Sequence, residues 1–92
     1  MTGDITGLSP FRQKYTVFTN ERGGIIDDLM ITALPEGYFL VVNAACKEKD
    51  YSLLQEATKN RCRLTMLSEK ALLAVQGPAA AVSLEKFDPE IA

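Results

Sequence analysis

Two turn signals separate three runs of sheet-forming residues, and this pattern is what most constrains the fold. The runs cover residues 15–19, 25–34 and 38–43 and are rich in β-branched, aromatic and other apolar side chains. The segment 20–24 ends in two glycines, which can take the positive φ angles of a hairpin loop. The segment 34–37 has proline second and glycine fourth, as a type I turn favours. Such short connections predict an antiparallel three-stranded meander.

The segment after the third run predicts a helix that covers one face of this meander. Residues 47–61 carry apolar side chains at helical spacing, with charged side chains between them. The apolar stripe consists of Leu53, Leu54 and Ala57. Because one helix can cover only one face of the sheet, the other face is expected to be exposed. An exposed apolar face of that size favours self-association.

The last third of the chain predicts two further strands and a short helix. The strands are expected over 64–68 and 71–76, and Pro78 is placed to begin a helix that continues to residue 84. The predicted order is therefore β-β-β-α-β-β-α, an α+β fold. Residues 1–92 are interpreted as a single partial domain.

Composition excludes several classes of function. A chain of 92 residues forms at most one small domain. Its 10 basic and 12 acidic residues give a net charge of -2, which argues against nucleic acid or a membrane surface as partner. No apolar run is long enough to span a bilayer, and the first residues lack the pattern of a secretory signal.

The cysteine and histidine content argues against metal chemistry. Cys46 and Cys62 are interpreted as free thiols in a reducing compartment. The chain contains no histidine, so a zinc site would need cysteines and carboxylates alone, and no metal is expected. The lack of histidine also excludes a histidine-based nucleophilic triad within this segment.

The candidate chemistry lies in Asp27 and Asp28, which stand next to each other inside an apolar strand. Neighbouring strand residues point to opposite faces, so Asp28 shares a face with Met30, while Asp27 shares the other with Leu29. A carboxylate on an apolar face is costly unless it is paired, hydrogen-bonded or protonated. A sequence that required only a stable strand would rarely place two such residues there.

The expected strand register gives Asp28 polar neighbours. If Leu34 opposes Gly37, counting back along both strands brings Asn43 opposite Asp28. If residues 20–23 form the first loop, Tyr15 also opposes Asp28. The predicted row of phenol, carboxylate and amide, with Met30 beside it, suits a flat, amide-rich heterocycle. A one-residue bulge at the glycine pair would change these neighbours.

Structural interpretations compete with this functional one. For Asp27 we favour a structural role, in salt bridges or as the cap of a neighbouring helix in a part of the protein outside these 92 residues. For Asp28 the residue types alone leave function and structure evenly balanced. Taken singly, Tyr15 is typical of a core and Asn43 is typical of a strand end.

Several blocks, in order and at similar spacing, resemble the T-proteins of the glycine cleavage system, which are aminomethyltransferases. The resemblance covers nearly the whole chain. The blocks are YTVFTNE at 15–21, GGIIDDL at 23–29, VVNAAC at 41–46, KD at 49–50 and ALLAVQGP at 71–78.

The resemblance implies an activity, its partners and its site. Members of that family transfer a one-carbon unit from the aminomethyl-lipoyl arm of H-protein to tetrahydrofolate, the co-substrate, and release ammonia. Asp28 matches the catalytic aspartate beside the attacking folate nitrogen, whose developing charge it would stabilise or accept. Tyr15, Met30 and Asn43 match folate contacts. A bacterial member would be cytoplasmic, and a eukaryotic one would lie in the mitochondrial matrix.

The sequence also departs from the family pattern. Family members are much longer, and their upstream pocket residues and downstream glycine-rich pterin-binding tract have no counterpart in these 92 residues. The isolated chain is therefore expected to be inactive. Two alternatives share the same fold: a folate-binding module of an iron–sulfur-assembly protein, and the folate domain of a sarcosine or dimethylglycine oxidising enzyme.

Overall fold

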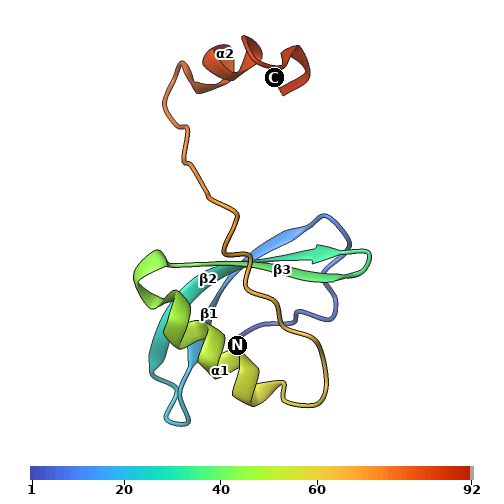
Figure 1. The fold of residues 1–92 in the computed structure, drawn as a ribbon, viewed down its shortest axis with the longest axis vertical. Helices are drawn as coiled ribbons and strands as arrows, with labels where there is room; N and C mark the ends of the chain where they lie inside the picture. Colours follow the sequence, from blue (N-terminus) through green and yellow to red (C-terminus); the bar gives the residue numbers. More distant parts are fainter. Residues whose placement is uncertain (92) are drawn as a thin grey trace.

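A three-stranded antiparallel sheet forms the centre of the molecule. The computed structural model describes residues 1–91. The sheet contains β1 (Gln13–Thr19), β2 (Ile25–Leu34) and β3 (Gly37–Val42) in the order β1-β2-β3 (Figure 1). Each strand pairs with the next one along the chain, so the predicted meander is confirmed.

The second hairpin has the predicted register. Leu34 pairs with Gly37, and the ladder runs back to the pair Leu29 and Val42. Asp28 precedes Leu29 on β2, and Asn43 follows Val42 just past the end of β3. They therefore face each other at the open end of this ladder, while Asp28 is still paired with Val17 of β1.

The first hairpin differs from the prediction by two residues. Tyr15 pairs with Met30, not with Asp28. Thr19 pairs with Ile25, which makes the loop one residue longer than expected, and an irregularity beside Thr19 adds a second residue to β2. Because side chains alternate with a period of two, the combined shift keeps Tyr15 on the face of Asp28.

One face of the sheet carries the core. After a short 3-10 turn, η1 (Ala44–Cys46), the helix α1 (Lys47–Ala57) lies across this face (Figure 1). Alternate residues of β2 are buried beneath it, while the residues between them are half-exposed. The buried side chains of the sheet are Thr16, Phe18, Asp27, Leu29, Ile31 and Ala33. One helix therefore covers one face, as predicted.

Helix α1 ends earlier than the predicted residue 61. The hydroxyl of Thr58 donates to the carbonyl oxygen of Leu54 at 2.7 Å, and the Thr58 amide donates to the same carbonyl. Asn60 then takes a positive φ of 63°, which turns the chain out of the helix. Thr58 thus makes the last regular hydrogen bond of the helix, and the positive φ of Asn60 prevents a further turn.

The two further strands predicted over 64–68 and 71–76 are not formed. Within residues 1–91, no strand follows β3. The chain there is extended, its few backbone hydrogen bonds are local, and Leu72 and Leu73 are 76% and 87% exposed. A strand needs a partner edge for its backbone groups, and sheet-forming residues alone do not supply one.

The end of the chain stands apart from the sheet. Helix α2 (Ala80–Glu85) and the 3-10 turn η2 (Pro89–Ile91) contact each other at the end of the extended segment (Figure 1). The short helix was predicted, but it begins at Ala80 and not at Pro78. No helix among the described residues has the length and apolar character needed to cross a membrane.

Candidate functional site

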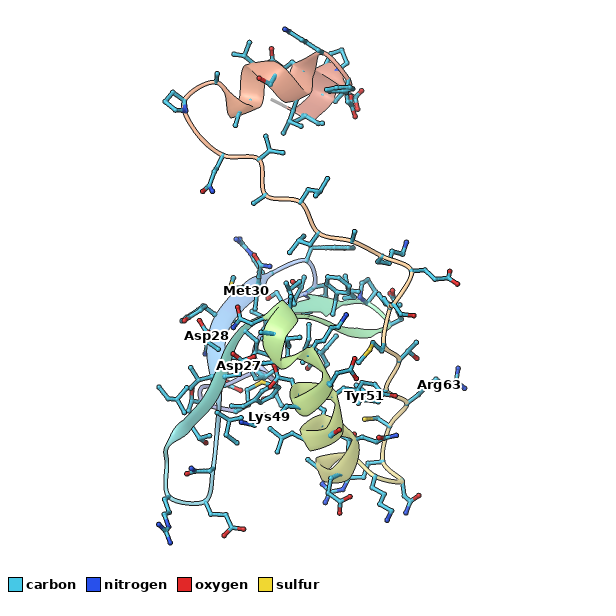
Figure 2. All side chains as sticks on the ribbon, turned by 60° about the vertical axis from the view of Figure 1, so that its left-hand side comes forward. Asp27, Asp28, Met30, Lys49, Tyr51 and Arg63 are labelled. Carbon is cyan, nitrogen blue, oxygen red and sulfur yellow. The ribbon has the colours of Figure 1, made fainter. Side chains whose placement is uncertain are left out.

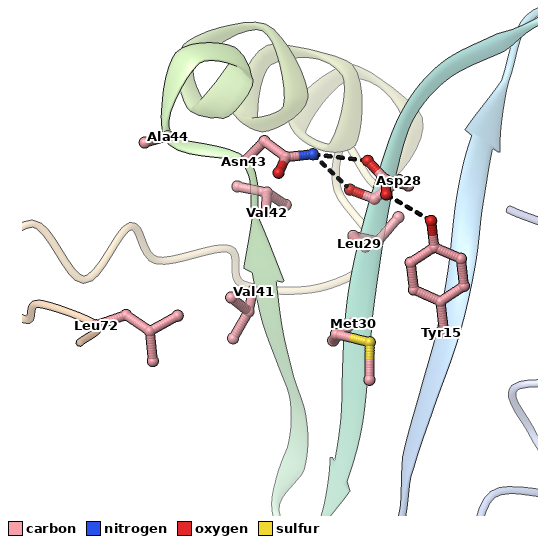
Figure 3. Close-up of a pocket in the computed structure, with 9 residues that line it drawn as sticks. All are labelled: Tyr15, Asp28, Leu29, Met30, Val41, Val42, Asn43, Ala44 and Leu72. Atoms are coloured by element: carbon pink, nitrogen blue, oxygen red, sulfur yellow. Dashed lines mark hydrogen bonds between the residues drawn. The ribbon is translucent and has the colours of Figure 1, made fainter. Parts of the chain in front are cut away.

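Asp28 is held by two side chains from the neighbouring strands. The phenol of Tyr15 donates to its Oδ2 at 2.5 Å, and Nδ2 of Asn43 donates to its Oδ1 at 2.7 Å (Figure 3). Tyr15 reaches Asp28 diagonally across the ladder, because its direct partner is Met30. The predicted group of phenol, carboxylate and amide is therefore present, although one of the two pairings behind it was wrong.

These hydrogen bonds favour the ionised form of Asp28. The Tyr15 hydroxyl first, and then the Asn43 amide, hold the pKa of Asp28 below its ordinary value. Desolvation and the charge of Asp27 oppose this shift. The same contact raises the pKa of Tyr15, so its phenol stays protonated. At neutral pH the site presents a carboxylate that a phenol and an amide hold in place.

Asn43 joins both aspartates. Its Nδ2 also donates to Oδ1 of Asp27 at 2.7 Å and lies 3.2 Å from the backbone oxygen of Asp28. Only the amino end of an amide can satisfy several surrounding acceptor oxygens. The backbone oxygen of Asn43 accepts from the Cys46 amide, so Asn43 starts the turn η1 with its backbone while its side chain serves the acids.

A shallow hollow lies beside Asp28 on the open face of the sheet. Its volume is about 440 Å³, within the range of small-molecule sites. Apolar side chains from β2, β3 and the extended segment surround the polar group (Figure 3). The hollow is lined by Tyr15, Asp28, Leu29, Met30, Val41, Val42, Asn43, Ala44 and Leu72. The structure thus brings together all four residues predicted for the site: Tyr15, Asp28, Met30 and Asn43.

Asp27 points to the opposite face, toward helix α1. Its carboxylate accepts from Asn43 and lies close to the carboxyl of Asp50, which lowers its pKa. Among residues 1–91 its neighbours are thus an amide and a second acid, and the expected cap of a helix outside this chain stays a prediction. The placement of Asp27 on the buried face with Leu29 was predicted correctly.

Sequence reasoning missed Asp50, although the sequence contained a signal. Asp50 is on α1 and is 1% exposed. It precedes Leu53, Leu54 and Ala57 by three, four and seven residues, so it belongs to the apolar stripe of the helix. An acid in such a stripe needs a buried partner, and the other unexplained buried acid of the chain is Asp27.

The remaining candidates lie outside this site. Cys46 is half-buried and Cys62 is exposed, and both are free thiols, as predicted. Across residues 1–91, no three or more histidine, cysteine, aspartate or glutamate side chains are grouped so that they could hold a metal ion.

Comparisons with known proteins show which family the chain belongs to. The family model described as the GCVT N-terminal domain matches residues 1–91. The chain is 45% identical over 91 residues to the human mitochondrial aminomethyltransferase, covering 92% of this chain and 23% of the relative. It is 47% identical over 89 residues to the aminomethyltransferase of Geobacillus thermodenitrificans, covering 95% and 24%. For the mitochondrial enzyme of Dictyostelium discoideum the identity is 38% over 95 residues, covering 95% and 24%.

These matches fix the family and the extent of the likeness. The chain spans about a quarter of the length of the curated relatives that it matches. The eukaryotic relatives among them are named as mitochondrial proteins. Since the family model covers nearly every residue, this chain belongs to the GCVT N-terminal domain family, whose named relatives are aminomethyltransferases.

Proposed function

We propose that this segment forms one wall of the folate site of a glycine-cleavage aminomethyltransferase. The reaction moves a one-carbon unit from the aminomethyl-lipoyl arm of H-protein to tetrahydrofolate and releases ammonia. The observation that carries the proposal is Asp28, an ionised carboxylate held by Tyr15 and Asn43 at the edge of an apolar hollow.

Asp28 acts on the attacking nitrogen. A folate amine that attacks the lipoyl-bound carbon gains positive charge as the new carbon–nitrogen bond forms. A carboxylate within hydrogen-bond reach stabilises that charge and accepts the proton that the nitrogen loses. Because the pKa of Asp28 is lowered, the carboxylate is ready for this role at neutral pH.

The neighbouring residues orient the substrate. Met30 and Val41 give the hollow an apolar floor on which a flat pterin ring packs. Tyr15 and Asn43 each donate a hydrogen bond to one oxygen of the Asp28 carboxylate and fix its orientation. The other lone pairs of these oxygens are then available to the ligand. This division of roles matches that of a site with few polar groups in an apolar lining.

The 92-residue chain alone is proposed to be inactive. It spans about a quarter of the length of its relatives, and its hollow has a single wall. The second wall and the surface for lipoylated H-protein would come from segments that the longer relatives contain. The compartment is proposed to be the mitochondrial matrix if the source is eukaryotic and the cytoplasm if it is bacterial.

A chimera tests this function. The 89-residue segment of the Geobacillus thermodenitrificans enzyme that aligns with this chain is replaced by the sequence of this chain. The assay follows methylenetetrahydrofolate formed from aminomethyl-lipoyl H-protein. We expect the chimera to be active and Asp28→Asn to lower its kcat by roughly 100-fold or more. Glu36→Gln, an exposed acid in the turn before β3, is the matched control and should leave kcat unchanged.

The outcomes separate the alternatives. A folded chimera that binds folate without transferring the carbon would favour the binding module of an iron–sulfur-assembly protein or of a sarcosine or dimethylglycine oxidising enzyme. Full activity of Asp28→Asn would remove Asp28 from the mechanism. Turnover by the 92-residue chain itself would refute its proposed inactivity.

A further inference from the structure

Two acidic side chains meet in the core beneath the candidate site. Asp27 on β2 is 8% exposed, and Asp50 on α1 is 1% exposed. The two carboxyl groups lie close enough to shift each other's pKa, downward for Asp27 and upward for Asp50. Of their four oxygens, Asp27 Oδ1 accepts from Asn43, and the other three find no donor group among residues 1–91. Buried oxygens without a donor are unusual and require an explanation.

A shared proton explains the contact. Two ionised carboxylates in contact repel each other, and both would lose hydration on burial. One proton between them turns this repulsion into a hydrogen bond and gives two of the three orphaned oxygens a partner. Carboxyl pairs that hold one proton between them are an established arrangement in proteins.

The surroundings supply little positive charge to replace that proton. The charged groups that act on Asp50 are Asp27, across from it on β2, and Lys49, its neighbour on α1. Figure 2 shows Asp27 beside α1 and Arg63 projecting away from the sheet and the helix. Burial first, and then Asp27, raise the pKa of Asp50 to about 6, although Lys49 acts in the opposite direction. Contact with Asp50 first, and then the hydrogen bond from Asn43, lower the pKa of Asp27. These opposite directions favour Asp50 as the group that carries the proton of the pair.

We propose that Asp27 and Asp50 share one proton and that this pair acts as a positioning element for Asp28, through Asn43. The contacts form a continuous chain from the core to the hollow: Asp50 to Asp27, Asp27 to Asn43, and Asn43 to Asp28. Asp50 holds Asp27 as an acceptor, and Asp27 anchors one side of the Asn43 amino group. The other side of that amino group then holds the carboxylate of Asp28.

This arrangement makes the position of Asp28 depend on the protonation of a buried acid pair. When the shared proton is lost, Asp27 and Asp50 repel, and Asn43 loses a fixed anchor. The importance of this for catalysis rests on the proposed function. The proton and the Asn43 contact do not, and they can be measured without any substrate.

The test is a carboxyl-detected NMR titration of the 92-residue chain. We expect the Asp50 carboxyl carbon to titrate with a midpoint near 6, well above its ordinary value of 3.8. The NMR signal of the Asn43 side-chain amide should shift with that same midpoint. Loss of the shared proton alters the position or the charge of the Asp27 carboxylate to which this amide donates. An Asp50 midpoint near 3.8, or an Asn43 amide that ignores the Asp50 step, would overturn the proposal.

Variants give a second, independent reading of the same experiment. In Asp50→Asn, the amide donates to Asp27 in place of the proton. The Asn43 amide should then keep its low-pH position and lose its step near pH 6. Asp50→Ala removes the donor and should displace the Asn43 resonance at every pH. Glu48→Gln, an exposed acid of the same helix turn, is the control and should leave the step in place.

The outcomes stay distinct from those of the transfer assay. If Asp50→Ala fails to fold, the wild-type titration and Asp50→Asn still decide the question. A step that persists in Asp50→Asn would show that another group titrates and would refute the pair. Absence of transfer in the chimera leaves these NMR results intact, and a missing Asp50 step leaves the role of Asp28 intact.

Discussion

Asp27 and Asp28 are adjacent in β2, yet the two faces of the sheet give them different roles. Asp28 lies on the open face, where a phenol and an amide keep it ionised beside a hollow. Asp27 lies on the covered face, where its neighbour is a second acid on helix α1. Asn43 contacts both residues. A single strand thus places one carboxylate beside the hollow and the next in the core, which is the arrangement that our proposed catalytic and anchoring roles require.

The largest expected contrast between the two faces is in packing. Ile31 is buried on the covered face, whereas its neighbour Met30 is half-exposed on the open face. Ile31→Ala should lower the free energy of unfolding by about 2–3 kcal/mol, because it leaves a cavity in the core. Met30→Ala should cost less than about 1 kcal/mol. Chemical denaturation of the 92-residue chain measures both changes.

An equal loss of unfolding free energy in Ile31→Ala and Met30→Ala would contradict the expected difference between the two faces. It would mean that something covers Met30 in solution. The sequence predicts self-association through the exposed face, so gel filtration across a range of concentrations identifies a second copy as the cover. Loss of that association in Met30→Ala would locate it on the open face.

A smaller contrast should appear in the pH dependence of stability. The pKa of Asp50 is raised in the folded state, so its contribution is fully present below pH 3.8 and is lost as the pH rises to about 6. The loss is about 1–3 kcal/mol. The pKa of Asp27 is lowered, so its contribution is present above 3.8 and is lost as the pH falls further. Stability should therefore be highest near pH 4 and should decline from there to about pH 6.

Urea unfolding at a series of pH values measures this dependence. Asp50→Asn should remove the decline above pH 4, because an amide does not titrate there. The Glu48→Gln control should keep it. A wild-type chain whose stability increases from pH 4 to 7 would contradict the assignment of the proton to Asp50.

The sequence predicted those parts of the fold that depend on local chemistry. The turn at 34–37 sets the second hairpin, and its register followed from counting residues. The first hairpin depended on a loop and a bulge that no residue type dictates, so Tyr15 was paired with the wrong residue. Tyr15 nevertheless contacts Asp28. The longer loop and the bulge shift the register by one residue each, and a total shift of two residues leaves the Tyr15 side chain on the same face.

The failures came from parts whose structure depends on distant partners. Residues 64–76 have sheet-forming side chains but do not pair with either edge strand, β1 or β3. They remain extended, with Leu72 beside the hollow. Asp50 was missed because its role requires knowing that α1 crosses β2 at Asp27. Asp28, Met30 and Asn43 were found by counting residues along the two strands from the turn at 34–37. The family resemblance gives these three residues and Tyr15. Their contact with folate stays a prediction.

The smallest predicted effect concerns Tyr15, which within residues 1–91 is the side-chain hydrogen-bond partner of Asp28 besides Asn43. Tyr15→Phe removes the hydroxyl that lowers the pKa of Asp28 and keeps the aromatic ring. Asp28 is solvent-accessible, so water replaces part of the lost hydrogen bond and the effect should be small. The Asp28 carboxyl should titrate at a higher pH in the NMR experiment, and kcat of the chimera should fall by about 3-fold to 10-fold. Tyr38→Phe, on an exposed tyrosine of β3, is the matched control. If Tyr15→Phe leaves the Asp28 titration unchanged, Asn43 alone holds the carboxylate. The open face would then depend entirely on its anchor from the covered one.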